Sequence, residues 1–333
     1  MSRLAAGRAG SPASILGIGA HRGSRVVPNA ELVAAIDSSD EWIRQRSGIR
    51  ERRFATPEET VQMMSVQASR EALDAAGIEA GQVDAVIVAT ISHLMQLPAV
   101  APAVATELGC DQPVAFDVSA ACAGFCHGVT LAADMIRGGS ATYVLVVGVE
   151  RLTDMLDLED RGTSFIFADG AGAVVIGPSE TSGIGPVVWG SDGEHFDLIR
   201  QRGDWQGVLD DAQPGGHFIT MQGSAVFRWA SYSMAKIGLE ALDRAGVSVD
   251  ELDCFIPHQA NMRITDAMAR SMKLPASVKI ARDIVDQGNT SAASVPLALH
   301  RMVADGDAVS GDLALLIAFG AGLAYAAQVV VVP

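Results

Sequence analysis

The sequence has few aromatic residues, few cysteines and little positive charge. Only 5% of its 333 residues are aromatic and four are cysteine, while 24 Lys and Arg stand against 39 Asp and Glu, giving a formal charge of −15. Because binding to the phosphate backbone requires a basic surface that displaces counterions, we expect no role in nucleic-acid binding.

Long apolar runs are also lacking. No stretch approaches the ~18 consecutive apolar residues of a membrane span, and residues 1–14 lack the apolar core of a signal peptide. Spacing among the four cysteines (Cys110, Cys122, Cys126 and Cys254) is too irregular for a disulfide framework, and Cys122 and Cys126 lack the further ligands of a metal site. We therefore expect a soluble cytoplasmic protein with reduced thiols, no metal and no membrane contact.

What the sequence does have is an internal repeat, in a chain that is 49% hydrophobic and long enough for two domains. The segment 71–88 matches the segment 240–257 at an offset of 169 residues, half the chain. Each copy predicts an amphipathic helix, stopped by Gly77 or Gly246, and then a buried strand.

The order of elements continues in parallel in the two halves. Strands are expected at 114–118 and 278–281, small-residue helices from about 121 and 291, and further strands at 143–149 and 313–319, then 172–177 and 325–332. Apolar runs of this kind are typical of largely parallel sheets buried on both faces. We predict two βαβαββ halves, 15–180 and 181–333, in an α/β/α/β/α arrangement after an N-terminal extension, 1–14.

Three segments have no counterpart in the other half, and we expect them to carry function. They are approximately residues 25–60, 94–103 and 191–221.

Cys122 is the first candidate for chemistry. It follows a predicted strand and begins a helix of small residues, in the run Asp117-Val-Ser-Ala-Ala-Cys-Ala-Gly-Phe-Cys126. The positive end of a helix dipole favours a thiolate and so a nucleophile. A small buried core residue is the alternative.

His258 and Asn289 are the candidate partners. His258 ends the second copy of the repeated strand, where open α/β sheets place ligands, although a core histidine is the alternative. Asn289 lies in a loop whose alternative role is a simple turn and N-cap. Because adding 169 to Cys122 gives Ser291, we expect the Asn289 loop to be the counterpart of the Cys122 loop and to face it. The run Phe319-Gly-Ala-Gly-Leu323 either connects two strands tightly or offers backbone N–H groups to an oxyanion.

These motifs, in this order and spacing, resemble β-ketoacyl-acyl-carrier-protein synthase III of the thiolase superfamily from about residue 15 to the C-terminus. The resemblance rests on Ser39-Asp-Glu-Trp-Ile-Arg-Gln-Arg-Ser-Gly-Ile-Arg50, Ser119-Ala-Ala-Cys-Ala-Gly124, Asp160-Arg-Gly-Thr163, Phe167-Ala-Asp-Gly-Ala-Gly172, His258-Gln-Ala-Asn-Met-Arg263 and Gly288-Asn-Thr-Ser-Ala-Ala-Ser294. It implies a thiolase-like fold and a homodimer that condenses an acyl-CoA starter with malonyl-acyl carrier protein. It implies no cofactor of the enzyme's own, since acyl-CoA is a substrate and the carrier protein carries the phosphopantetheine.

The same resemblance assigns roles to the three central residues. Cys122 matches the nucleophile that holds the acyl group, and His258 with Asn289 matches the pair that stabilises the enolate after decarboxylation. The thioester oxyanion is expected between the backbone N–H groups of Cys122 and Ala321. Ala321 departs from the glycine common in the family, and the substitution retains the donor only if its φ is negative.

Other residues match binding positions in the family. Trp42 and Arg161 match a stacking pair for the CoA adenine, Arg46 a phosphate ligand and Asn261 a residue along the pantetheine path. Arg228 and Arg263 match a docking patch for the acidic carrier protein. Leu97 matches a residue that closes the acyl pocket of the partner subunit, where leucine in place of phenylalanine predicts tolerance of branched or four- to five-carbon starters.

Related activities fit less well. Degradative thiolases carry a second cysteine near the C-terminus, whereas the last cysteine here is Cys254. Elongating synthases have a histidine at the position of Asn289. Plant-type polyketide synthases are longer than this chain. A non-catalytic carrier-protein-binding partner of the same fold would usually lose the nucleophile. The starter group, and the choice between fatty-acid initiation and priming of a secondary-metabolite pathway, stay open.

Overall fold

The structure is a computed structural model that describes residues 9–209 and 215–333. Residues 1–8 of the expected N-terminal extension lie outside the described residues. The first strand begins at Ala13, two residues before the expected start of the N-terminal half.

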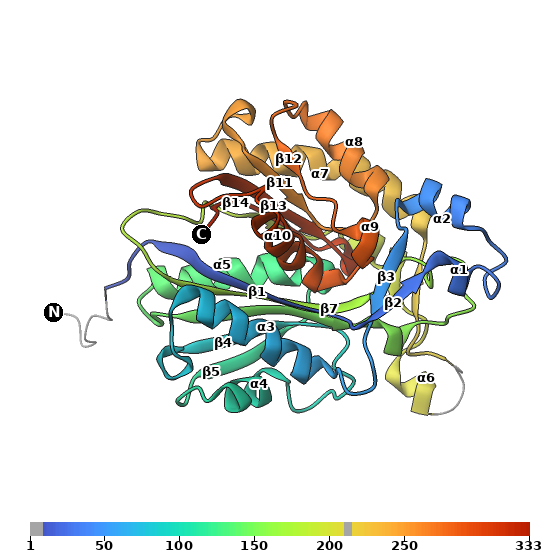
Figure 1. Cartoon of the computed structure of the whole chain (residues 1–333), viewed down its shortest axis with the longest axis horizontal. Helices are drawn as coiled ribbons and strands as arrows, with labels where there is room; N and C mark the ends of the chain where they lie inside the picture. The colour runs from blue at the N-terminus through green and yellow to red at the C-terminus, as the bar shows by residue number, and fades with distance from the viewer. Residues whose placement is uncertain (1–8, 210–214) are drawn as a thin grey trace.

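Two five-stranded sheets form the framework (Figure 1). The first has the order β1-β7-β6-β4-β5 and the second β12-β11-β13-β14-β8. Matching strands occupy matching places, so each sheet repeats the other. The strand bounds are β1 (Ala13–Arg22), β4 (Ala85–Ala89), β5 (Val114–Val118), β6 (Val144–Arg151) and β7 (Asp169–Pro178) in one half, and β8 (Val188–Gly190), β11 (Cys254–Pro257), β12 (Lys279–Ile280), β13 (Leu313–Phe319) and β14 (Tyr325–Val331) in the other.

Two details of the predicted repeat are wrong. Each half has the order βαβαβαββ rather than βαβαββ, because β1 and β8 each open a half and are joined by a helix to the rest. Each sheet also has two parallel and two antiparallel pairings, so it is mixed rather than largely parallel. Strands buried on both faces are apolar in either case, so the sequence pattern does not distinguish the two.

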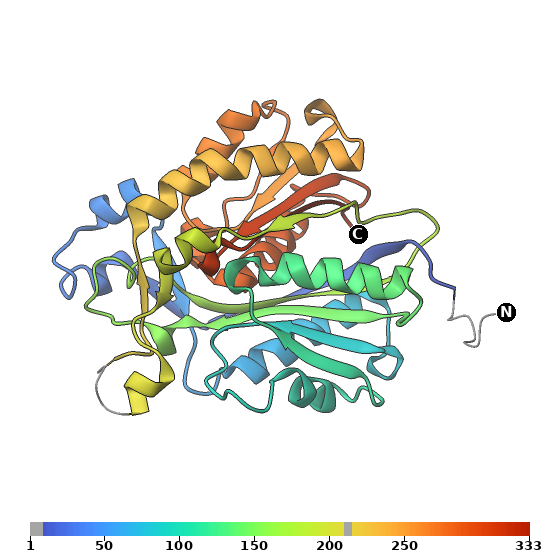
Figure 2. The same ribbon diagram turned by 180° about the vertical axis from the view of Figure 1, so that it is seen from behind.

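Helices form the other three layers, as predicted. The helices α5 (Gly124–Arg137) and α10 (Ser294–Ala304) lie between the two sheets and share one apolar core with both of them. The helices α3 (Val61–Ala76) and α4 (Ala101–Leu108) cover the outer face of the first sheet, while α7 (Gly223–Ala245) and α8 (Met262–Met272) cover that of the second (Figure 2). The repeated helices α3 and α7 end at Gly77 and Gly246 with φ of 65° and 69°, as the sequence predicts.

The segments without a counterpart lie together at one end of the sheets, at the right in Figure 1. They comprise β2 (Arg25–Pro28), α1 (Asn29–Leu32), α2 (Asp40–Ser47), β3 (Glu51–Phe54), β9 (Ile199–Gln201), α6 (Trp205–Leu209) and β10 (Ile219–Met221), and α9 (Ile284–Gln287) packs against β3. This end holds the main cavity.

Candidate active site

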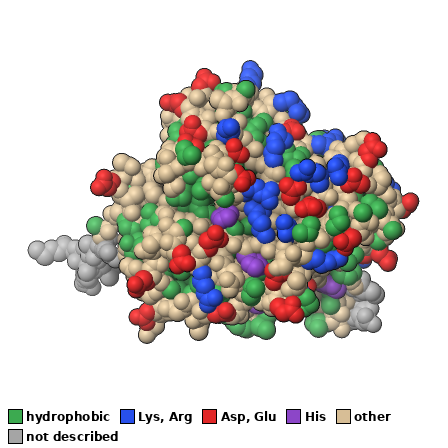
Figure 3. All heavy atoms as spheres, in the orientation of Figure 1, with side chains coloured by type: hydrophobic (Ala, Val, Ile, Leu, Met, Phe, Trp, Pro, Cys, Tyr) green, Lys and Arg blue, Asp and Glu red, His purple; other side chains and the backbone are tan. Residues whose placement is uncertain are grey.

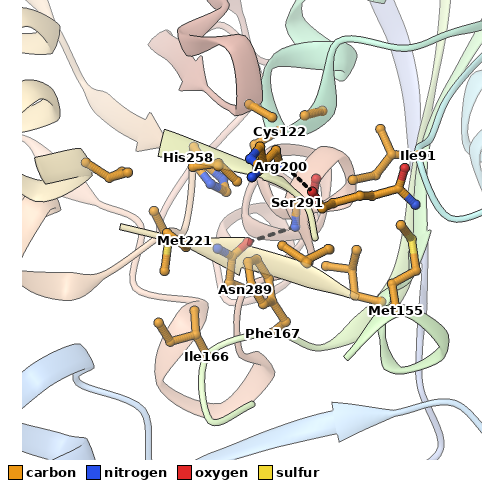
Figure 4. A pocket seen from close by; sticks show the side chains of 18 of the residues that line it. Ile91, Cys122, Met155, Ile166, Phe167, Arg200, Met221, His258, Asn289 and Ser291 are labelled. Carbon is orange, nitrogen blue, oxygen red and sulfur yellow. Dashed lines mark hydrogen bonds between the residues drawn. The ribbon is translucent and has the colours of Figure 1, made fainter. Parts of the chain in front are cut away.

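A cavity of about 1120 Å³ joins the two halves and the segments without a counterpart. Cys122, His258, Asn289 and Ala321 all line it. Apolar side chains, among them Ile91, Met155, Phe167 and Met221, surround this polar group (Figure 4). The structure thus brings the predicted nucleophile and its predicted partners into one space that is suited to an acyl chain.

Cys122 lies on a short helical turn, η2 (Ala121–Ala123), that leads from β5 into α5. The turn begins with a strained residue, because Ala121 has a φ of 46°, and it places the thiol at the inner end of the cavity. Cys122 is only 9% exposed, and burial raises the pKa of its thiol to about 12. Burial thus outweighs the helix N-terminus, and the resting group is a thiol rather than the thiolate expected from the sequence.

The loop of the second half that corresponds to Cys122 is shifted by one residue from the prediction. The turn η6 (Ser291–Ala293) repeats η2, and Ser291 has a φ of 48°, like Ala121. The counterpart of Cys122 is therefore Ala292, not Ser291. The helices α3 and α7 and the strands β4 and β11 keep the offset of 169, so the shift arises in the segments between those strands and the two turns. The two loops do contact each other, as expected.

His258 directly follows β11, and hydrogen bonds fix both its backbone and its ring. Its backbone N–H donates to the carbonyl oxygen of Ile317 at 2.7 Å, and its ring Nδ1 lies 2.6 Å from the Ser294 hydroxyl oxygen. That hydroxyl also accepts the N–H of Gln259 at 3.4 Å, and we assign its proton to the bond with Nδ1, which places the ring proton on Nε2. Burial lowers the pKa of His258 to about 3, so the ring is neutral.

Asn289 is fixed by its own loop. Its side-chain oxygen accepts the backbone N–H of Ser291 at 2.8 Å, which turns its NH₂ group away from that contact (Figure 4). Its backbone bonds on both sides to the strand-like segment at Ile166 and Ala168. Asn289 is 5% exposed and His258 3%, and both present N–H donors without charge. Such donors stabilise a developing negative charge on a carbonyl oxygen.

The turn η7 (Ala321–Leu323) carries the residue that is expected to offer the second backbone donor. Gly320 packs against the turn that carries Cys122, and a Cβ atom built on it would lie 2.6 Å from the Cys122 nitrogen. Positive φ values occur at Gly322 and Leu323 but not at Ala321. The alanine therefore meets the condition that its backbone N–H remain available beside that of Cys122.

Trp42, on α2, forms an aromatic platform at the mouth of the cavity. Two guanidinium groups lie over its ring, with the Arg161 carbon 4.6 Å and the Arg46 carbon 5.3 Å from the ring centroid, and the Phe165 ring makes a T-shaped contact with it at a centroid distance of 5.1 Å. Asn261 caps α8 through its side-chain oxygen and donates to the Arg46 carbonyl oxygen at 2.8 Å. All four predicted CoA residues thus line the same cavity.

The two predicted docking arginines lie on helices that pack against each other. Arg263 on α8 stacks on Phe227 of α7 at 4.8 Å and also lines the cavity, whereas the exposed Arg228 does not. Lys and Arg side chains gather on the face over α8 and α9 (Figure 3), despite the net charge of −15. Leu97 is 83% exposed and does not line the cavity of its own chain.

Sequence reasoning missed two polar residues of the site, Glu150 and Ser291. Glu150 is the last but one residue of β6 and is completely buried, and the Ser291 side chain is within reach of both Glu150 and Cys122. The signal for Glu150 was the same as for His258, a titratable residue directly after a buried apolar strand. The segment 191–221 supplies further lining residues, as expected of a segment without a counterpart: Phe196, Ile199, Arg200, Gln201, Trp205, Ile219 and Met221.

A metal site and a membrane-spanning helix are both absent from residues 9–209 and 215–333. No group of three or more His, Cys, Asp or Glu side chains in these ranges is arranged to hold a metal ion. None of the helices in these ranges combines the length and apolar character needed to cross a membrane.

Comparisons with known proteins agree with this geometry. A family model for 3-oxoacyl-[acyl-carrier-protein] synthase III matches residues 116–193, and the model for its C-terminal part matches residues 242–332. The chain is 55% identical to β-ketoacyl-[acyl-carrier-protein] synthase III 1 of Streptomyces coelicolor and 52% identical to a mycobacterial β-ketoacyl-[acyl-carrier-protein] synthase III of Mycobacterium marinum, over 100% of this chain and 99–100% of theirs.

Solved structures give the same result. The priming β-ketosynthase of the R1128 polyketide pathway superposes with a TM-score of 0.97 at 45% identity, covering 100% of this chain and 99% of that one. The 3-oxoacyl-[acyl-carrier-protein] synthase III of Aquifex aeolicus superposes with a TM-score of 0.89 at 38% identity, covering 96% and 99%. The chain therefore belongs to the β-ketoacyl-acyl-carrier-protein synthase III family, the acyl-transferring enzymes of thiolase fold whose condensation initiates fatty-acid or polyketide synthesis.

Proposed function

We propose that Cys122 takes the starter acyl group from acyl-CoA and that His258 and Asn289 activate malonyl-acyl carrier protein for condensation. The observation that carries the proposal is the convergence of one buried thiol and two neutral N–H donors on one apolar cavity. No charged base is needed at the second step, because loss of carbon dioxide itself generates the nucleophilic carbon.

The chemistry takes place in two half-reactions. In the first, the Cys122 sulfur bonds to the acyl carbon, the bond from that carbon to the CoA sulfur breaks, and CoA leaves as its thiol. In the second, the malonyl group loses carbon dioxide, and the enolate oxygen accepts hydrogen bonds from His258 Nε2–H and the Asn289 amide. The enolate carbon then bonds to the acyl carbon of the Cys122 thioester, whose oxygen is held by the N–H groups of Cys122 and Ala321. The bond from that carbon to the Cys122 sulfur breaks, and the departing thiolate takes up one proton from solvent to restore the thiol.

The mouth of the cavity is proposed to bind both thioester carriers. Trp42 with Arg161 stacks on the CoA adenine, Arg46 contacts phosphate, and Asn261 borders the pantetheine. An acidic carrier protein docks at Arg228 and Arg263, which is compatible with the net charge because screening limits exposed charges to a reach of ~10 Å.

We propose a cytoplasmic homodimer of chains that divide at about residue 180. Supporting the dimer, β5 is an edge strand with Val114 56% exposed, and Leu94, Met95 and Leu97 are exposed nearby in sequence. Leu97 then reaches the acyl pocket of the partner subunit. A leucine there leaves room for branched or four- to five-carbon starters as well as acetyl.

The experiment that tests this function separates the half-reactions. Wild type incubated with competing acetyl-, isobutyryl- and butyryl-CoA is expected to gain one acyl mass, located on Cys122 by peptide mapping. Cys122→Ser is expected to lose acyl transfer yet retain malonyl decarboxylation, since His258 and Asn289 act without the thiol. A starter thioester on Cys126 or Cys254, with Cys122 unmodified, would refute the assignment.

A second competition, between carrier proteins, addresses the pathway. The solved relative at 45% identity is a priming β-ketosynthase of a polyketide pathway, which favours priming of a secondary pathway as the second candidate function. Equal use of carrier proteins from fatty-acid and polyketide pathways would fit both candidate functions. A strong preference for one carrier protein would identify the pathway that the enzyme serves.

A further inference from the structure

Glu150, on β6, is a carboxylate with half of its hydrogen-bonding capacity unused. It is 0% exposed, and its Oε2 atom accepts three bonds, from the Ser92 hydroxyl at 2.6 Å, the Ile91 N–H at 3.1 Å and the Thr90 hydroxyl at 3.2 Å. Its Oε1 atom has no hydrogen-bond partner. Buried carboxylate oxygens are normally satisfied, so an open one beside a reactive group calls for a functional explanation.

Ser291 connects this carboxyl to the nucleophile. Its side chain is within reach of both the Cys122 thiol and the Glu150 carboxyl, but its hydroxyl forms a well-aligned hydrogen bond with neither in the resting site. Its backbone is fixed by the bond from its N–H to Asn289 and by its positive φ. The hydroxyl therefore needs only to turn about its own side-chain bond to link sulfur and carboxyl.

Among the described residues, the two other polar side chains placed with Cys122 are not free to receive its proton. His258 Nδ1 is occupied by Ser294, and Nε2 already carries the ring proton. Asn289 presents its NH₂ group. Among the described residues, no cationic side chain pairs with Glu150. The titratable side chain that interacts electrostatically with Glu150 is Cys122.

We propose that Cys122, Ser291 and Glu150 form a proton relay for acylation, in which Glu150 acts through Ser291 and does not touch the reacting atoms. As the Cys122 sulfur bonds to the acyl carbon, the thiol proton passes to the Ser291 oxygen, and the Ser291 proton passes to Glu150 Oε1. The acyl carbon then releases the CoA sulfur, the proton returns along the same path to that thiolate, and CoA leaves as its thiol. This inference rests on the proposed role of Cys122.

The surroundings suit a group that gains and loses a proton. Burial raises the pKa of Glu150 to about 7, so the carboxyl is partly ionised near neutral pH. Glu150 can accept a proton only when its carboxyl is ionised. Because its pKa is about 7, the proton acceptor for acylation becomes available as the pH rises through about 7. The relay therefore predicts an acidic limb in the rate of acylation that decarboxylation of malonyl-carrier protein lacks.

The test uses Glu150→Gln and Ser291→Ala in the full chain. Alanine is tolerated at this backbone conformation, because Ala121 adopts it in the other half. The rate of acyl-Cys122 formation from acetyl-CoA is measured by quench and intact mass between pH 5.5 and 8.5, with malonyl decarboxylation measured in parallel. We expect acylation to fall at least tenfold in each variant, the acidic limb to disappear, the double variant to lose no more than the single ones, and decarboxylation to stay within about twofold.

Ser69→Ala is the matched control, since Ser69 is a buried serine on α3 whose hydroxyl also lacks a partner but lies outside the site. It is expected to acylate like wild type. Unchanged acylation rate and pH profile in folded Ser291→Ala overturns the relay, even if Glu150→Gln fails to fold. Slow acylation in Glu150→Gln alone overturns the path through Ser291. An acyl group absent from Cys122 in wild type refutes the proposed function instead.

Discussion

At the scale of single residues, a serine determines which nitrogen of a histidine can serve the reaction. Ser294 accepts from Gln259 and donates to His258 Nδ1, so that the N–H of the neutral ring is on Nε2. A hydrogen bond to the ring nitrogen that does not serve the reaction sets the tautomer and the orientation of a functional histidine. The chemistry of His258 therefore depends on a hydroxyl that does not itself contact the substrate.

Ser294→Ala is expected to lower the rate of malonyl decarboxylation by about tenfold to a hundredfold, because a free Nδ1 allows the ring to rotate and to exchange tautomers. Acylation of Cys122 should change little and serves as the internal control. The two half-reactions are followed separately by release of carbon dioxide and by intact mass. Equal loss in both would show that Ser294 supports the fold rather than the tautomer.

At the scale of elements, the site depends on the close approach of two turns. Gly320, next to η7, packs on the turn that carries Cys122, so closely that a Cβ atom would lie 2.6 Å from a backbone nitrogen. The backbone at Gly320 is extended, with a φ of −155°, so the glycine is required by space and not by its conformational freedom. The spacing of the two proposed oxyanion donors, the N–H groups of Cys122 and Ala321, thus depends on the absence of a side chain at position 320.

Gly320→Ala is expected to push the two turns apart, to lower acyl transfer by about a hundredfold and to destabilise the fold by about 1–3 kcal/mol. Gly81→Ala is the matched control, since a Cβ atom there meets nothing within 4 Å. Acyl transfer and the midpoint of urea unfolding are measured for both variants. Full activity in Gly320→Ala would show that the oxyanion is not held between these turns.

At the scale of the whole molecule, a strongly acidic protein presents basic side chains near its cavity mouth. The formal charge is −15, yet Arg228 and Arg263 lie together on α7 and α8. Long-range attraction changes association rates and is weakened by salt.

Replacing both arginines by glutamate is therefore expected to lower kcat/KM for malonyl-carrier protein about tenfold or more at low salt and to flatten its salt dependence. Acylation by acetyl-CoA should remain near the wild-type rate. Both are measured between about 25 and 300 mM salt. Equal losses with both substrates would indicate a folding defect instead of a docking role.

In the proposed dimer the starter preference also belongs to the whole assembly, since Leu97 is exposed and does not line the cavity of its own chain. Leu97→Phe is expected to shift the relative kcat/KM toward acetyl-CoA over isobutyryl-CoA by about 1–3 kcal/mol, the effect of a methylene-sized change in an apolar pocket. Competition between the two CoA esters measures the shift. An unchanged ratio in a stable dimeric variant would remove Leu97 from the pocket.

Local sequence by itself determined the repeated framework and the identity of the central residues. The repeated sequence predicted that α3 and α7 end at glycines and that buried strands follow them. These features depend on residues that are neighbours along the chain. Motif order alone selected Cys122, His258 and Asn289 as candidates, and the structure places them around one cavity together with residues of the segments without a counterpart.

Only the tertiary structure decided how these parts meet. Strand direction in the mixed sheets, the one-residue shift between the Cys122 and Ser291 turns, and the protonated state of the thiol all depend on contacts between distant segments. Glu150 shows this most clearly: its sequence position marks it as the end of a strand, but its burial and its place beside Ser291 arise from the packing of both halves. Burial and proximity set the electrostatics of a site, and neither is a property of local sequence.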